Sequence, residues 1–418
     1  MADLRGNAVF AQAGGPTAAI NSSLAGAIQE AMAQTCFDDL YGASDGILGV
    51  LQEELFDLRK ERADDIEDLK RTPSAAMGSC APRNGDADLE RILEVFRAHN
   101  VRYFFYVGGS EAMLAAGGIA RLAAGTGHEM RVMGIPGTAE NDLAHTDHVP
   151  GYGSAVKCCA TAVMEAGRDT EALWSCEPCT VMEVPGRSAG WLAAGAGLAR
   201  REEGDAPHLI YLPERPVSLA RVAEDVRGCI ARHHRCFIAA AEGMKNESGE
   251  YLAPAPGGAG AGETEGAQAG GVAGVLGGFI EKEVGVAVRT CRPGTAQRNA
   301  MHFASLVDID EAVECGRAAV RKAAMGQSGF MMTLVREGGP VYRCSVGSVA
   351  LSEVIGSEKP VDDEFINEQG NGITEAMKHY VRPLVRGEAP ISVGPDGLPI
   401  YVRLARRFVP KKCAQWEP

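Results

Sequence analysis

Short apolar runs that end in glycine-containing turns recur along this chain, and they constrain the fold more than any other feature. The runs and turns are 8–11 before Gly14 and Gly15, 103–107 before Gly108 and Gly109, and 132–135 before Pro136 and Gly137. Ala-rich stretches at 18–34 and 112–124 follow the first two turns and have helical composition. Alternating strands and helices predict an α/β protein with mostly parallel sheets. Because ligands of open α/β sheets bind beyond the carboxyl ends of the strands, these turns are expected to line a binding site.

The second half of the chain restarts the same pattern. Strands are predicted at 180–184, 208–212 and 236–241, and 418 residues are enough for two domains. Between residues 245 and 274 the composition shifts to Gly, Ala, Pro and Glu. Such a segment buries too little apolar surface to offset its ordering entropy, so we expect a flexible surface insertion, either a tolerated loop or a lid.

Composition and charge exclude several classes of function. A net charge of −14 argues against a nucleic-acid partner, although a few Arg residues and helix N-termini are enough to bind one phosphorylated metabolite. No uninterrupted apolar stretch reaches about 18 residues, so no membrane span is expected. Without a signal-peptide pattern the expected location is the cytoplasm, and the twelve Cys residues are expected to be free thiols. The pair Cys176 and Cys179 lacks the second pair that a zinc site usually needs.

Eight segments carry a resemblance to a known family. They are Ala11–Asn21, Gly42–Gly49, Gly78–Cys80, Tyr106–Gly109, Pro136–Leu143, Gly186–Trp191, Gln297–Arg298 and Gly397–Leu404. In this order they resemble the phosphofructokinase family, and its pyrophosphate-dependent type most closely. The resemblance implies the phosphofructokinase fold, with two Rossmann-like three-layer lobes and the site in the cleft between them.

The resemblance also implies how the chain divides between the two lobes. Residues 1–150 and about 297–350 would form the lobe on the phosphate-donor side. Residues 151–296 and about 351–418 would form the lobe on the sugar-phosphate side.

The implied family reaction is phosphoryl transfer from pyrophosphate to O1 of fructose 6-phosphate, with Mg²⁺ as the cofactor. The implied catalytic residues are Thr138, Glu140 and Asp142, with Glu140 at the position of the base, and Glu111 is the implied metal ligand. Backbone N–H groups of glycine turns approach phosphate oxygens closely, and catalysis rests on positioning and charge neutralisation. The implied donor-phosphate site comprises Gly14, Gly15, Gly108, Gly109 and Arg83.

Four positions depart from the family pattern on the donor side, and one of them is Glu111, which stands in a changed metal-binding motif. Glu140 replaces the family's Asp, Gly137 replaces a Lys, and Ala81 replaces an Arg, with Arg83 two positions further on. Losing cations from a phosphoryl-transfer site costs several kcal/mol of transition-state stabilisation. We therefore expect a weakly active or inactive sugar-phosphate-binding or regulatory homologue, alone or beside an active paralogue.

Two alternatives stay open. One is an active pyrophosphate-dependent 6-phosphofructokinase whose donor site is rebuilt from Glu111, Glu140, Arg83 and Lys157. The other is an enzyme adapted to a different phosphorylated metabolite. The Glu at position 111 fills space that ATP would need in the family, so pyrophosphate is the expected donor.

The sugar-phosphate side keeps more of the family pattern. The implied substrate-binding residues are Arg187, Glu214, Arg289 and Arg298. In the resemblance Glu214 holds sugar hydroxyls, and Arg289 and Arg298 hold the 6-phosphate, which suits bidentate guanidinium groups. Relatives complete this site with an Arg from a neighbouring subunit, so a homo-oligomer, dimer or tetramer, is expected with Arg289 in that role. The alternative for Arg289 is a surface salt bridge.

Overall fold

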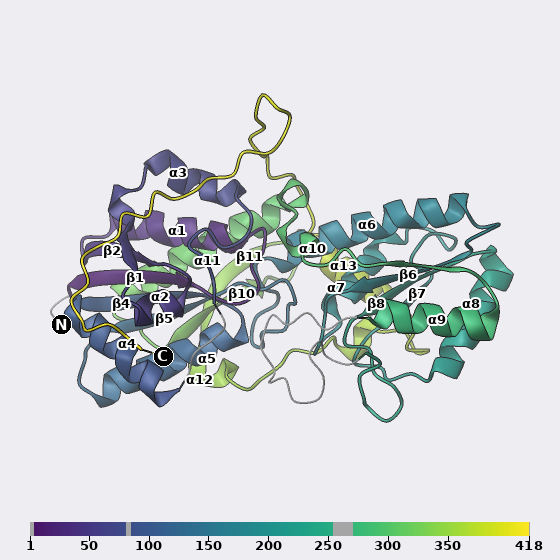
Figure 1. Cartoon of the computed structure of the whole chain (residues 1–418), viewed down its shortest axis with the longest axis horizontal. Helices are drawn as coiled ribbons and strands as arrows, with labels where there is room; N and C mark the ends of the chain where they lie inside the picture. The colour runs from purple at the N-terminus through teal and green to yellow at the C-terminus, as the bar shows by residue number, and fades with distance from the viewer. Residues whose placement is uncertain (1–3, 81–84, 254–270, 418) are drawn as a thin grey trace.

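A computed structural model describes residues 4–80, 85–253 and 271–417, and the strands within these ranges form two sheets in two lobes (Figure 1). The larger sheet has seven strands in the order β11-β10-β5-β4-β1-β2-β3, and the smaller has four in the order β7-β8-β6-β9. All strand pairs are parallel except β10–β11 and β2–β3, at the two edges of the larger sheet. The expected α/β class with mostly parallel sheets is confirmed.

The described strands of the larger sheet are β1 (Gly6–Gln12), β2 (Phe37–Ala43), β3 (Leu55–Asp57), β4 (Val101–Gly108), β5 (Arg131–Pro136), β10 (Phe330–Arg336) and β11 (Cys344–Ala350). Those of the smaller sheet are β6 (Cys179–Val184), β7 (Leu209–Tyr211), β8 (Cys236–Ala241) and β9 (Val288–Cys291). The described α-helices are α1 (Ile20–Ala33), α2 (Ile47–Leu51), α3 (Ala63–Asp68), α4 (Asp86–Ala98), α5 (Ser110–Gly125), α6 (Tyr152–Ala172), α7 (Trp191–Ala196), α8 (Leu219–His233), α9 (Val272–Val284), α10 (Ala296–Asn299), α11 (Leu306–Ala324), α12 (Leu351–Val354) and α13 (Glu375–Val381).

Alternating side chains of the central strands build a separate core on each face of the larger sheet. Ala8 and Phe10 of β1 belong to one buried cluster with side chains of α1 and α11. Val9 and Ala11 belong to another with side chains of α4 and α5. Since successive side chains of a strand point to opposite faces, the central residues Ala8 to Ala11 of β1 are all apolar and the lobe has three layers. The smaller sheet likewise separates a core shared with α6, α7 and α13 from one shared with α8 and α9.

The C-terminal part of the chain differs from the expected division between lobes. Leu351 and Val354 of α12 pack into the core of the larger lobe, whereas Val361 to Leu384 pack on the smaller one. The last segment then returns and runs over the larger lobe (Figure 1). Its backbone pairs with β3, since the amide of Asp57 donates to the carbonyl of Arg407 and the amide of Val409 donates to the carbonyl of Leu55. The tail thus covers the exposed edge of the larger sheet.

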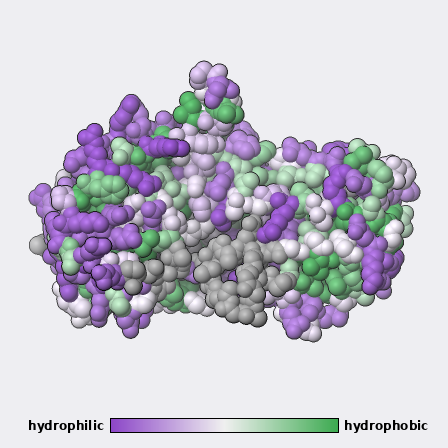
Figure 2. Space-filling model, in the orientation of Figure 1, coloured by the Kyte–Doolittle hydropathy of each residue, from purple (hydrophilic) through white to green (hydrophobic). Residues whose placement is uncertain are grey.

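Two further segments are the expected insertion at 245–274 and a hairpin near the C-terminus. Of the expected insertion at 245–274, residues 254–270 lie outside the described residues, and residues 272–274 already belong to α9, whose Val272 and Ala273 are buried. Residues 392–401 form a hairpin that projects from the body, and Figure 2 shows apolar surface on this projection. Among the described residues, every helix is too short or too polar to cross a membrane.

Candidate active site

The first two glycine turns lie next to each other at the carboxyl ends of β1 and β4. Gly14 has a φ of 74°, a left-handed conformation that favours glycine. A Cβ atom on Gly14 would lie 3.9 Å from the backbone nitrogen of Gly109. The hydroxyl of Ser79 donates to the carbonyl of Gly14 at 2.9 Å, which fixes the turn. The structure therefore brings three of the predicted donor-site glycines, Gly14, Gly15 and Gly109, to one edge of the sheet.

The loop after β5 adjoins these turns. The amide of Gly137 donates to the carbonyl of Gly108 at 2.9 Å, and a Cβ on Gly109 would lie 3.8 Å from Cβ of Thr138. The hydroxyl of Thr138 accepts a hydrogen bond from the amide of Glu140 at 3.1 Å. The predicted catalytic loop and the predicted phosphate turns thus meet at one place.

Asn141 holds this loop in position. It is fully buried and has a φ of 58°, which Asn adopts more readily than most residues. Its side-chain oxygen accepts from the amide of Val149 at 3.0 Å, and its side-chain nitrogen donates to the hydroxyl of Tyr380 at 3.2 Å. The carbonyl of Asp142 accepts from the amide of Lys359 at 2.9 Å. Partners from α13 and the preceding segment therefore fix the conformation of Glu140 and Asp142.

Arg298 links the two halves of the site. A Cβ on Gly15 would lie 2.6 Å from Nη1 of Arg298, so this guanidinium group lies directly against the first glycine turn. The carbonyl of Arg298 also accepts from the amide of Ala18 at 2.7 Å, which ties α10 to the first glycine turn. Burial lowers the pKa of Arg298, and attraction to Glu140 and Glu242 opposes that shift. A cation of the sugar-phosphate set thus lies beside both the donor turn and the carboxylate expected to act as the base.

Glu242 is a residue of this site that the sequence reasoning did not assign. It follows β8 directly, is 7% exposed, and its carboxylate accepts from the amide of Gly186 at 3.4 Å. Burial raises the pKa of Glu242 to about 7, and the nearby Glu183 adds to the shift. The sequence feature that could have identified Glu242 is its position at the end of a buried strand, immediately before a glycine.

The other predicted sugar-phosphate residues are more dispersed. The Glu214 carboxylate accepts from the amides of Gly190 and Val361, both at 2.9 Å, so it organises two loops. The guanidinium carbon of Arg187 lies 5.8 Å from the ring centre of Tyr251 and close enough to attract the charge of Glu242.

Arg289 lies apart from these residues, on β9. Its guanidinium group forms ion pairs with Asp169 and Glu177 of the same chain. The salt-bridge alternative is therefore realised in this structure.

Glu111 has the chemistry of the metal ligand that the resemblance implies. It lies in the first turn of α5, two positions after Gly109. Its Oε2 atom is buried, and no hydrogen-bond partner for it exists within the described residues. A carboxylate oxygen left unpaired beside phosphate-binding turns fits Mg²⁺, which prefers oxygen ligands. Arg83, the remaining predicted donor residue, lies outside the described residues.

Glycine turns, a half-buried guanidinium group and carboxylates at the ends of parallel strands define a phosphate-binding α/β protein. The family model described as Phosphofructokinase matches residues 7–322. The chain belongs to the phosphofructokinase family, as its motifs led us to expect.

Three relatives show how far the similarity extends. The pyrophosphate–fructose 6-phosphate 1-phosphotransferase of Xanthomonas campestris pv. campestris is 41% identical over 419 residues, 99% of either chain. The crystal structure of pyrophosphate-dependent phosphofructokinase from Marinobacter aquaeolei gives a TM-score of 0.90 at 36% identity, covering 99% of this chain and 100% of that chain. The corresponding crystal structure from Nitrosospira multiformis gives 0.91 at 35% identity, covering 98% and 99%. The phosphofructokinase fold is therefore confirmed.

Proposed function

We propose that this chain transfers a phosphoryl group from pyrophosphate to O1 of fructose 6-phosphate. The observation that carries the proposal is the position of Arg298, beside Gly15 on the donor side and within electrostatic reach of Glu140 and Glu242. Relatives named for this reaction align with the chain over almost its whole length. They support the active alternative better than the weakly active or regulatory homologue that the altered donor positions predict.

On the donor side, backbone N–H groups replace much of the missing side-chain charge. The turns after β1 and β4 present amides where pyrophosphate oxygens would bind, and such concave groups of amides favour anions. Glu111 would hold Mg²⁺, which when bound supplies positive charge at the transferring phosphoryl group. These two features compensate for only part of the positive charge that a Lys at Gly137 would supply.

On the acceptor side, Glu140 acts as the base. Its amide is held by Thr138, so its backbone position is fixed before substrate binds. As the O1 hydroxyl attacks the phosphorus atom, its proton passes to the Glu140 carboxylate and inorganic phosphate leaves. A Glu in place of Asp moves the carboxylate by about 1 Å, a change that slows proton transfer without abolishing it.

The sugar phosphate is held by charge that is already in place. Arg298 is a half-buried cation, and both Arg298 and Arg187 lie within electrostatic reach of Glu242. A carboxyl group with a pKa near 7 both accepts and donates hydrogen bonds at neutral pH, and this suits Glu242 to a sugar hydroxyl.

The direct test is a coupled assay for fructose 1,6-bisphosphate with purified protein, fructose 6-phosphate, Mg²⁺ and either pyrophosphate or ATP. We expect product with pyrophosphate and none with ATP, at a rate of about 1 s⁻¹ or less because the donor side has fewer cations. Absence of product with pyrophosphate, together with thermal stabilisation by fructose 6-phosphate alone, would instead support a regulatory sugar-phosphate-binding protein.

Substitution of the base gives a second test. Glu140→Gln keeps the shape of the side chain but cannot accept the proton, and we expect kcat to fall about 10²–10⁴-fold with little change in KM. Glu129→Gln is the matched control, because its exposed carboxylate pairs with Arg131 at the other end of β5. Equal losses in both variants would contradict the assignment of Glu140.

A further inference from the structure

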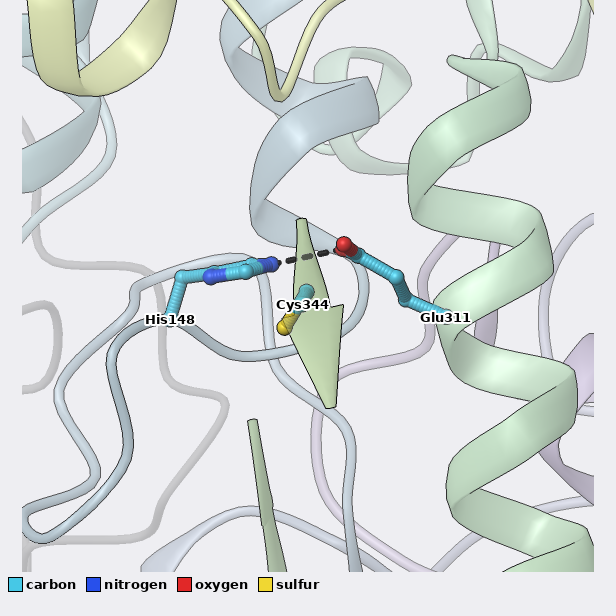
Figure 3. A group of neighbouring side chains, drawn as sticks. All are labelled: His148, Glu311 and Cys344. Atoms are coloured by element: carbon cyan, nitrogen blue, oxygen red, sulfur yellow. Dashed lines mark hydrogen bonds and ion pairs between the residues drawn. The ribbon is translucent and has the colours of Figure 1, made fainter. Parts of the chain in front are cut away.

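A compact group of potential metal ligands is formed by residues that the proposed reaction does not use. His148 belongs to the segment between the catalytic loop and α6, Glu311 lies on α11, and Cys344 is the first residue of β11 (Figure 3). One nitrogen, oxygen and sulfur atom of these three residues lie within 4.8 Å of one another. Figure 3 shows the His148 ring and the Glu311 carboxylate directed toward each other, with the Cys344 thiol beside them.

The spacing of the His148 and Glu311 atoms is close to what a bound ion requires, and the Cys344 sulfur lies within 4.8 Å of both. Nε2 of His148 lies 2.7 Å from Oε2 of Glu311. Zinc–ligand distances of about 2.0–2.3 Å in a tetrahedron place neighbouring ligand atoms roughly 3.3–3.6 Å apart. The His148–Glu311 pair would have to open by about 0.6 Å, a movement that side-chain rotation supplies.

Two outer contacts orient the ligands as metal sites require. Nδ1 of His148 lies 2.8 Å from Oδ1 of Asp147, and Arg336 donates to the same carboxylate at 3.0 Å. The hydroxyl of Tyr342 donates to Oε1 of Glu311 at 2.6 Å, which leaves Oε2 facing the imidazole. A carboxylate on the far nitrogen of a histidine is the usual second shell of a zinc ligand, since it fixes the ring and raises its basicity.

We propose that His148, Glu311 and Cys344 form a binding site for a zinc-class divalent cation, with a water molecule as the fourth ligand. The nitrogen, oxygen and sulfur donors select a borderline-soft ion such as Zn²⁺ over Mg²⁺ or Ca²⁺. The ion would join α11 and β11 of the larger lobe to the segment that follows Asp142 by six residues. Its binding therefore restrains the connection between the catalytic loop and the smaller lobe.

An ion-pair network without metal is the competing explanation for this cluster. The role of the Cys344 thiol distinguishes that network from a metal site. A histidine between two carboxylates needs no thiol, whereas the metal site needs the thiolate. The full-length protein, freed of metal by chelation, is titrated with Zn²⁺ by calorimetry and with Co²⁺ by absorption spectroscopy. We expect one ion per chain at this site and a thiolate-to-cobalt charge-transfer band.

The variants make the assignment specific. Cys344→Ser is expected to remove the charge-transfer band and to weaken Zn²⁺ binding at least about 10-fold, and Asp147→Asn to weaken it about 10–100-fold. Cys158→Ser, another half-buried thiol, is the matched control and keeps both signals. These mild changes are used because His148 is fully buried and its removal threatens folding. Failure of wild-type protein to bind either ion, or binding that Cys344→Ser leaves unchanged, would overturn the proposal.

Discussion

Replacing Gly137 by Lys tests whether missing positive charge limits this active site. The added side chain has room at its base. A Cβ on Gly137 would lie 3.4 Å from Cγ1 of Val107, 3.7 Å from Cγ1 of Ile20 and 3.8 Å from the amide nitrogen of Gly108, all ordinary contact distances. Gly137 is also not among the described residues with positive φ, so a side chain adds no backbone strain.

The expected gain follows from the charge that the Lys would bring. Replacing glycine where the backbone tolerates a side chain stabilises a protein by about 0.4–1 kcal/mol, so folding is not at risk. One well-placed donor on developing negative charge is worth about 3–4 kcal/mol, or roughly 10²–10³ in kcat. We therefore expect Gly137→Lys to raise kcat with pyrophosphate by about two orders of magnitude.

The control is Gly137→Met, which adds a side chain of similar length without charge and should leave kcat unchanged. Both variants are measured in the coupled assay, with melting temperature as a check of folding. If Gly137→Lys folds normally but its kcat equals that of wild type, donor charge is not what limits the reaction, and the reasoning fails.

Three further outcomes can be checked by denaturation and kinetics. The folded-state pKa of Glu242 is raised from 4.5 to about 7, so wild type should lose roughly 3 kcal/mol of stability as pH rises through that window, and Glu242→Gln should not. The pKa of His208 is lowered from 6.5 to about 4 by burial and by neighbouring cations, so stability should fall by a similar amount as pH drops from 6.5 to 4, and His208→Gln should flatten that slope. Arg289→Ala should cost about 1 kcal/mol or less, because its ion pairs are partly exposed; a large rise in KM for fructose 6-phosphate without loss of stability would instead place Arg289 in a substrate site.

The sequence was sufficient for the elements that surround the site. β1, β4 and β5 each contain a continuous apolar run, β4 ends at Gly108 and β5 at Pro136, and β1 ends two residues before Gly14, so the strands and the turns after them were predictable. Burial on both faces of a parallel sheet demands such continuous apolar runs. Gly14, Gly109 and Thr138 meet at one sheet edge because β1, β4 and β5 are neighbouring parallel strands, whose carboxyl ends lie at the same edge.

Contacts between distant segments could not be predicted from the local pattern of apolar and polar residues. Glu214 has the expected position in the chain, but the amides of Gly190 and Val361 hold its carboxylate, and no local spacing predicts them. His148, Glu311 and Cys344 come from three separate segments and form no motif. The C-terminal tail lacks a regular apolar period, so its pairing with β3 depends on an edge that only the folded sheet presents.

The chain builds part of the larger lobe first, then the smaller lobe, and then returns to complete the larger one. This order has a consequence for biosynthesis. When β5 leaves the ribosome, α11 and β10 of the same lobe have yet to be made, because α11 begins only at residue 306. At about 5–20 residues per second, one face of the nascent larger sheet waits on the order of ten seconds or more for its cover. Its apolar strands are open to chaperones throughout that interval. Protein that is synthesised slowly or cut short before α11 should therefore aggregate, whatever the stability of the finished molecule.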